Sequence, residues 1–169
     1  MKKVLIVGLG NPILGDDGIG WHVADKVKQH LEESNTQAFY TNSEIQVDVE
    51  CLAVGGLSLM EQLDGYDRAV IVDAMMTGSK PISSISIFDL EDLPDQAAGH
   101  LSSAHDTTLQ KALQVGGAMG VDLPEEITIV GIEANSVFDF SEKLTPALMA
   151  VVPQAVQTVL DILNRRKAG

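Results

Sequence analysis

Acidic side chains stand at the ends of two apolar segments of the sequence. Asp16 and Asp17 follow the apolar run at residues 4–7 after a glycine-rich loop, and Asp73 comes directly after the apolar run at residues 69–72. A carboxylate in apolar surroundings requires a partner, because burial of an unpaired charge is costly. These positions therefore indicate either cation binding or hydrogen-bonded caps.

His105 is the histidine whose position could bring it near these carboxylates. It lies in the polar stretch at residues 102–107, just ahead of a predicted helix. If that helix returns over the sheet in the usual sense, the imidazole lies on the same side as Asp17 and Asp73. One imidazole and two carboxylates would form an open site that suits Zn²⁺ or Ni²⁺ about equally. The residues alone predict no more than a candidate metal site.

Each of these residues also has a purely structural interpretation. Asp16 could cap the helix that follows, and Asp17 could favour its first turn; such a cap contributes roughly 0.5–2 kcal/mol. Asp73 could bond the amides of a turn. A loop histidine is more often an ordinary surface residue, which is the expectation for the other three, His22, His30 and His100.

The strands that must position these side chains fall into two kinds. Residues 4–7, 69–72 and 127–130 are mostly β-branched apolar runs, the pattern of parallel strands buried on both faces. Residues 45–51 and 84–88 alternate between apolar and polar side chains, so each of these strands is expected at a sheet edge with one face in water.

Helices are predicted between the strands. Apolar residues recur at near-helical spacing in two segments: at Ile19, Val23, Val27 and Leu31, and again at Leu148, Val152, Ala155, Val159 and Leu163. Thr145 and Pro146 have the types expected at the start of the last helix. A further helix is predicted from about Thr107 to Met119.

This alternation predicts an α/β fold: a single three-layer α/β/α domain over residues 1–169, with a mainly parallel, twisted, five-stranded sheet. The edge strand at residues 85–88 is free to run antiparallel. If the second strand pairs outside the first, the first and third strands become neighbours whose connections leave in opposite directions. That arrangement opens a crevice at their carboxyl ends, where a ligand is expected.

Composition narrows the class of protein. The chain has 169 residues, 45% of them apolar, and a formal net charge of −13, which disfavours nucleic acid as a partner. The apolar segment at residues 144–160 is interrupted by polar residues, so it is predicted to be a packed helix and not a membrane span. A single cysteine and the lack of an export signal predict a cytoplasmic protein.

Three motifs together resemble the hydrogenase maturation peptidases. They are V-G-L-G-N-P-I-L-G-D-D-G-I-G at residues 7–20, I-V-D-A at 71–74 and S-A-H-D at 103–106, and the likeness continues through Leu-Thr-Pro at 144–146. It implies an endopeptidase that removes the C-terminal extension of a hydrogenase large-subunit precursor after nickel insertion. It also implies metal ligation by Asp17, Asp73 and His105, with the nickel supplied by the substrate.

Several details stay open at this point. Relatives carry an Asp-Gly-Gly-Thr-type segment after the second strand, whereas this chain reads Cys51-Leu52-Ala53-Val54-Gly55-Gly56, so the substrate subtype is undetermined. Cys51 is expected to be a small buried residue outside the site. The nucleophile is undetermined, and Asp16 could serve as a base. The small size suggests a monomer that binds the precursor transiently.

Two other functions compete with this interpretation. Peptidyl-tRNA hydrolases also begin with G-L-G-N-P, but they carry a histidine-bearing segment after it and a basic face, where this chain has Asp16 and Asp17 and a net charge of −13. A non-catalytic nickel-binding or chaperone protein could use the same three ligands without breaking a bond.

Overall fold

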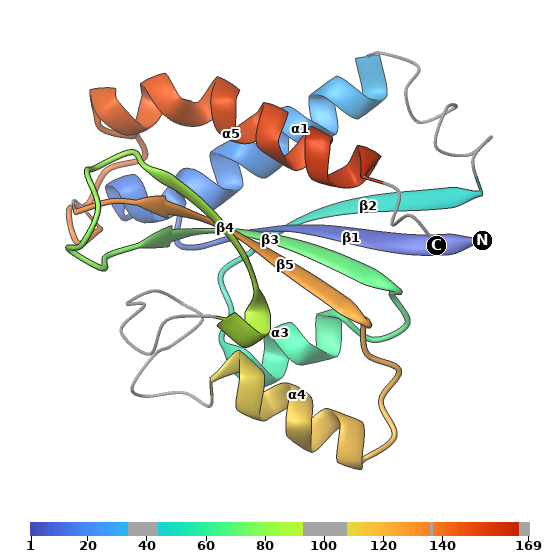
Figure 1. Cartoon of the computed structure of the whole chain (residues 1–169). Helices are drawn as coiled ribbons and strands as arrows, with labels where there is room; N and C mark the ends of the chain where they lie inside the picture. Colours follow the sequence, from blue (N-terminus) through green and yellow to red (C-terminus); the bar gives the residue numbers. More distant parts are fainter. Residues whose placement is uncertain (34–43, 93–107, 136, 166–169) are drawn as a thin grey trace.

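The computed structural model describes residues 1–33, 44–92, 108–135 and 137–165 (Figure 1). Five strands form one sheet in the order β2-β1-β3-β5-β4. The first three strands along the chain and β5 are parallel, and β4 pairs antiparallel with β5 at one edge. The strands are β1 (Lys2–Leu9), β2 (Ile45–Leu52), β3 (Arg68–Met75), β4 (Ile85–Asp89) and β5 (Glu126–Glu133). The predicted fold class and strand order are confirmed.

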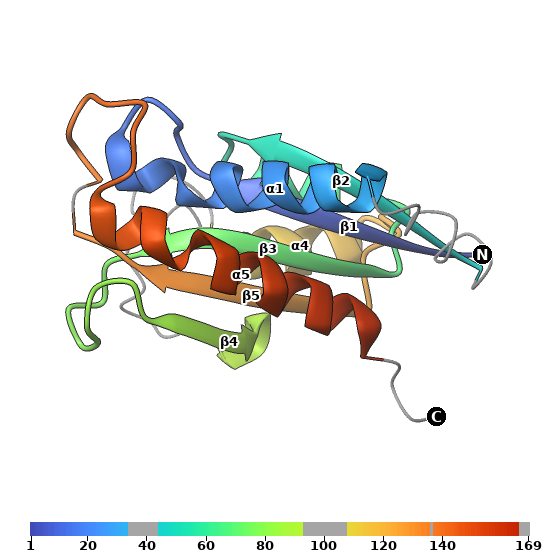
Figure 2. The ribbon, with the colours of Figure 1, turned by 90° about the horizontal axis from the view of Figure 1, so that it is seen from above.

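Helices cover both faces of this sheet (Figure 1). The helices α1 (Ile19–Glu33) and α5 (Pro146–Asn164) lie side by side on one face, as the second view also shows (Figure 2). The helices α3 (Gly56–Gln62) and α4 (Leu109–Ala118) pack against each other on the opposite face. Two short 3₁₀ helices, η1 (Gly15–Gly18) and η2 (Leu90–Asp92), complete the elements.

Two apolar cores explain why the strands form where the sequence predicts them. Alternate side chains of β1, β3 and β5 point to opposite faces of the sheet. One set, which includes Ile6, Val72 and Val130, packs under α1 and α5, and the other, which includes Leu5 and Ile71, packs under α3 and α4. Burial on both faces accounts for the unbroken apolar runs.

The predicted helices agree closely with the structure. All four α1 residues singled out by spacing, Ile19, Val23, Val27 and Leu31, are buried. The α4 helix begins after Thr108, whose hydroxyl accepts a hydrogen bond from the Lys111 amide. The seven-residue helix α3 was not predicted, because it is too short for apolar periodicity to stand out.

The apolar composition of α5 serves the core. Among the described residues this helix alone is long and apolar enough to cross a membrane by length and hydropathy. Its Leu148, Ala155, Val159 and Leu163 are nevertheless buried in the same cluster as residues of α1 and the sheet. The prediction of a packed helix is confirmed by this burial.

The connections at the carboxyl ends of the parallel strands leave in opposite directions. The chain passes from β1 through α1 to β2 on one side, and from β3 to β4 beyond β5 on the other. The loops after β1, β3 and β5 therefore gather at one end of the sheet, on the left in both ribbon views (Figures 1 and 2). This is the arrangement that the sequence predicted for a ligand site.

Candidate functional site

Asp17 lies in the 3₁₀ turn η1, which connects the loop after β1 to α1. Its carboxylate oxygen Oδ2 accepts a hydrogen bond of 2.8 Å from the Asn11 amide, so the loop before the turn holds the side chain. Asp17 is 8% exposed. A carboxylate fixed by backbone in a mostly buried position is suited to bind a cation without further reorganisation.

Glycines allow this turn to approach the sheet ends closely. A Cβ atom at Gly20 would overlap the carbonyl oxygens of Leu9 and Val72, which lie near the ends of β1 and β3. A Cβ at Gly10, where φ is +138°, would overlap the Asp17 carbonyl oxygen. The glycines of the first motif thus allow Asp17 to lie against the carboxyl ends of the strands.

Asp73 lies inside β3 and not after it. The strand continues to Met75, and Asp73 pairs in register with Gly131 of β5. The sequence analysis placed Asp73 after the apolar strand, at the sheet end, and this was wrong, because Asp73 is a buried strand residue with 1% exposure. The apolar run that marked the strand in the sequence ends early because Asp73 itself interrupts it.

The fold brings Asp17 and Asp73 to the same end of the sheet. The turn η1 packs against β3, and Val72, the neighbour of Asp73, contacts the backbone at Gly20. His105 lies outside the described residues. Among the residues that the structure does describe, no three acidic, cysteine or histidine side chains form a group that could hold a metal. The three-ligand site therefore stays a prediction.

Asp16 has a different role from its neighbour. Its Oδ1 accepts a hydrogen bond of 2.7 Å from the Thr145 amide, and its Oδ2 accepts one of 2.8 Å from the Thr145 hydroxyl. Asp16 is 0% exposed. It therefore anchors the first residues of α5 to η1 and places a negative charge at the positive end of that helix. This geometry favours a structural role for Asp16 over a role as a base. Asp16 binds the N-cap residue of α5, whereas the sequence predicted that it caps α1.

Glu133, at the end of β5, is a buried carboxylate that the sequence analysis missed. It is 4% exposed, and its two oxygens accept hydrogen bonds of 2.9 Å from the Thr77 hydroxyl and 2.8 Å from the Gly78 amide. These bonds fix the connection from β3 to β4. The signal was present, because Glu133 ends an apolar strand just as Asp73 interrupts one.

A small pocket is lined by residues of β3, β4 and β5 and of the connection from β3 to β4. It has a volume of about 180 Å³, and its lining includes Met75, Gly131 and Glu133. The Met75 sulfur occupies the place that a Cβ at Gly131 would take. Gly131 is the register partner of Asp73, but Asp73 itself does not line this pocket.

Cys51 does not belong to this arrangement. Its Sγ donates to the Trp21 carbonyl oxygen of α1 at 3.8 Å, which places the thiol on the α1 side of the sheet. Burial, and after it the nearby Asp25 and Glu50 carboxylates, raise the pKa of the thiol above its ordinary value. The residue therefore lacks the lowered pKa of a nucleophilic cysteine. It is partly and not fully buried, contrary to the prediction, and its place outside the site stays a prediction.

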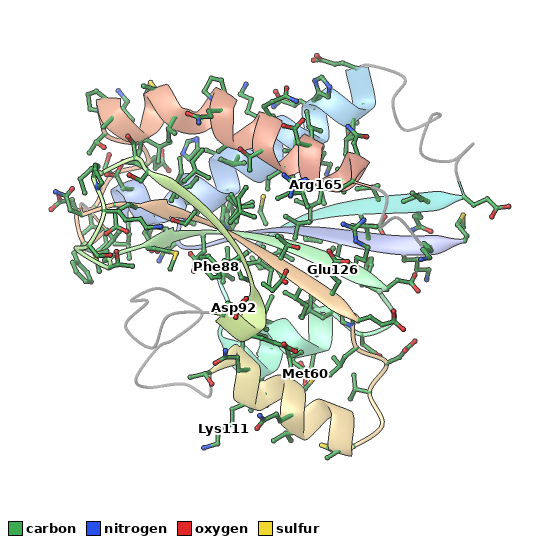
Figure 3. The ribbon with its side chains drawn as sticks, viewed as in Figure 1. Met60, Phe88, Asp92, Lys111, Glu126 and Arg165 are labelled. Atoms are coloured by element: carbon green, nitrogen blue, oxygen red, sulfur yellow. The ribbon has the colours of Figure 1, made fainter. Side chains whose placement is uncertain are left out.

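The larger pocket lies at the opposite end of the sheet. It has a volume of about 580 Å³, and its lining includes Arg68, Glu126 and Arg165. Glu126 begins β5, and Figure 3 shows it and Arg165 away from the end where the loops after β1, β3 and β5 gather. Pocket size alone would therefore direct attention away from the buried carboxylates.

Comparison with known proteins decides the family. Residues 21–162 match the family described as HycI, hydrogenase maturation protease. The chain belongs to the hydrogenase maturation protease family. It is 26% identical over 164 residues to the hydrogenase expression/formation protein HupD of Rhizobium leguminosarum, a match that covers 96% of this chain and 74% of that protein.

Solved structures agree with this membership. The [NiFe] hydrogenase maturation protease HybD from Thermococcus kodakarensis is 25% identical, with a TM-score of 0.63 over 96% of this chain and 99% of that one. The Escherichia coli hydrogenase maturating endopeptidase HybD, at 21% identity, shares the fold with a TM-score of 0.68, over 96% of this chain and 92% of that one. The family resemblance is thus confirmed, and this hydrogenase maturation protease is a peptidase and not a peptidyl-tRNA hydrolase.

Proposed function

We propose that this protease removes the C-terminal extension of a nickel-containing hydrogenase large-subunit precursor after nickel insertion. In this proposal Asp17, Asp73 and His105 recognise the nickel that the precursor carries. The nickel is part of the substrate, so the protease reads the loading state of the precursor and cleaves only when the metal is in place.

The observation that carries this proposal is the pair of buried carboxylates from neighbouring elements. Asp17 comes from η1 and Asp73 from β3, which are in contact at the carboxyl end of the sheet. A buried carboxylate is stable as an anion when a cation lies beside it. Carboxylate oxygens joined by an imidazole nitrogen make a donor set that nickel accepts.

A metal shared by the precursor and the protease would supply much of the catalytic effect by position. It would fix the scissile peptide relative to the buried carboxylates, which removes a large entropic share of the hydrolytic barrier. A bound divalent ion also polarises a carbonyl or lowers the pKa of a water ligand. The backbone amide of Asn11 would keep Asp17 oriented during the reaction through its hydrogen bond to the carboxylate.

The structure of the remaining polar residues supports water as the nucleophile. Cys51 has a raised pKa and donates to a carbonyl oxygen of α1, and Asp16 is held at both oxygens by Thr145. Neither side chain is arranged to attack a peptide carbonyl. We further infer that the protease acts in the cytoplasm as a monomer.

Cleavage of purified precursor tests the proposal. Nickel-loaded and nickel-free precursor are each incubated with the protease, and the large subunit is weighed by mass spectrometry. We expect shortening of the nickel-loaded precursor only, and its loss in Asp17→Asn, Asp73→Asn and His105→Ala. Exposed residues of α1 provide matched controls, Asp25→Asn and His30→Ala, which should cleave as the wild type does.

Two outcomes would overturn the proposal. Equal cleavage of nickel-free and nickel-loaded precursor would show that the protease does not recognise the nickel. An unshortened precursor that nonetheless binds in the presence of nickel would favour the chaperone function.

A further inference from the structure

Three large apolar side chains are exposed on two loops at the carboxyl end of the sheet. Ile13, in the loop after β1, is 47% exposed, and Phe138 and Phe140, in the loop after β5, are 77% and 85% exposed. We call these three side chains the apolar rim. The chain holds four phenylalanines in all, so two of the four face solvent at this one place.

The loop that carries the two phenylalanines is held in place. Val137 and Leu144, at its two ends, are buried in the core. In its middle, the Ser141 amide donates to the Ile13 carbonyl oxygen at 3.0 Å, and the Gly15 amide donates to the Ser141 carbonyl oxygen at 2.7 Å. The loop after β5 is therefore paired with the loop after β1, and the aromatic side chains are displayed from fixed backbone.

This pairing connects the apolar rim to the candidate site. Asn11, two residues before Ile13, holds the Asp17 carboxylate, and Asp16 holds Thr145 just beyond the aromatic loop. Under the proposed function, a protein that presents its nickel to Asp17 approaches the end of the sheet where these two loops lie. The rim is thus close to the surface that the substrate would contact.

From this geometry we propose that the apolar rim is the docking surface for an apolar patch on the folded body of the hydrogenase large-subunit precursor. The proposal rests on the proposed function, and it concerns the body of the precursor and not the extension that is removed. Exposed aromatic side chains on fixed backbone have the character of interface anchors, because they bury a large area and lose little conformational freedom. Short tails alone would bind weakly without such an anchor.

Steady-state cleavage of nickel-loaded precursor tests the rim with the double variant Phe138→Ser and Phe140→Ser. We expect KM to rise about tenfold or more while kcat changes less than about twofold, since lost docking contacts weaken binding before chemistry. The matched control is Met119→Ser, because Met119 is also 77% exposed but lies at the far end of α4. Its KM should equal that of the wild type.

Direct binding separates failure of the rim from failure of the proposed function. Biolayer interferometry measures the Kd of immobilised precursor for the wild type and for the double variant, whether or not cleavage occurs. A Kd about tenfold weaker in the double variant supports docking even if the wild type fails to cleave. An unchanged Kd, or no binding by the wild type, overturns it.

The oligomeric state provides the last check. The rim could instead join two copies of this chain. In that case light scattering after size exclusion will show a dimer for the wild type and a monomer for the double variant. That result would overturn docking of the precursor at the rim. Thermal melting confirms that the double variant is folded, since both side chains are exposed and contribute little to the core.

Discussion

The two ends of the parallel strands differ in how deeply their charged side chains are buried. At the carboxyl ends Asp16, Asp17, Asp73 and Glu133 are all buried, and backbone amides donate hydrogen bonds to Asp16, Asp17 and Glu133. At the amino ends Arg68 and Glu126 form an ion pair of 3.5 Å with side chains 19% and 22% exposed. An ion pair that water still reaches contributes little to stability, whereas burial of several like charges is costly.

Tyr66, near the amino ends of the strands, is a polar residue whose partner is a neighbouring carboxylate. Its hydroxyl donates to Asp48 at 3.0 Å, and burial together with that carboxylate raises the pKa of Tyr66 to about 12. A phenol with so high a pKa stays protonated and inert near neutral pH. The larger pocket at this end is lined by charged residues of both signs, two arginines and three carboxylates. The proposed site lies with the buried carboxylates at the carboxyl ends and not at the larger pocket.

The largest expected effect is the loss of processing when a carboxylate at the carboxyl ends is neutralised. Asp17→Asn and Asp73→Asn should each lower kcat/KM for nickel-loaded precursor by about 100-fold or more, equivalent to about 2.7 kcal/mol of transition-state stabilisation. Glu126→Gln, at the amino ends, should stay within about twofold of the wild type. Similar losses in all three variants would remove the distinction between the two ends.

Next in size is the effect of adding a methyl group where α1 meets the sheet. Gly20→Ala forces a Cβ into the Leu9 and Val72 carbonyl oxygens, and it should lower the free energy of unfolding by about 3 kcal/mol or more. Gly117→Ala, at the exposed second-to-last residue of α4 with no atom within 4 Å of the added Cβ, should instead raise it by about 0.5–1 kcal/mol. Urea titration measures both. Equal and small effects of the two substitutions would show that the fold does not need the close approach of α1 to the strand ends at Gly20.

Loss of the Asp16 anchor should have a somewhat smaller effect. Asp16→Ala leaves the Thr145 amide and hydroxyl without their acceptor, so the free energy of unfolding should fall by about 2–3 kcal/mol. Thr145→Val removes one of the two bonds and should cost about 1–2 kcal/mol. Cleavage by the folded fraction of Asp16→Ala should persist, and a complete loss of kcat in folded protein would instead assign Asp16 to catalysis.

The smallest effect concerns Cys51. Its raised pKa leaves less thiolate at a given pH than an ordinary thiol has, so iodoacetamide should alkylate it more slowly than free cysteine at pH 8.5. The rate should rise as the pH is increased toward and above the pKa. Mass spectrometry of quenched samples follows the reaction. Labelling faster than that of free cysteine would show that the Cys51 thiol is activated.

Much of the fold could be predicted from the sequence because it depends on local patterns. The apolar runs of β1, β3 and β5 and the four-residue spacing in α1 each follow from which side chains must be buried. The antiparallel edge strand β4 was identified by its alternation. The extent of β3 was underestimated, because the apolar signal stops at Asp73 while the backbone pairing continues to Met75.

The candidate site was less accessible to sequence reasoning because its contacts are distant in the chain. Asp16 and Thr145 are separated by 129 positions, and no pattern around either residue indicates the other. Glu133 was overlooked although it resembles Asp73 in its strand context. The placement of Asp17 and Asp73 at one end of the sheet could be predicted, since it follows from strand order alone.

The most direct test of metal reading is a comparison of affinities. Biolayer interferometry gives the Kd of the wild type and of Asp73→Asn for nickel-loaded and for nickel-free precursor. The wild type should bind the nickel-loaded precursor about tenfold more tightly or better, and Asp73→Asn should bind both forms equally. The same preference in Asp73→Asn, or no preference in the wild type, would contradict recognition of the nickel by the buried carboxylates.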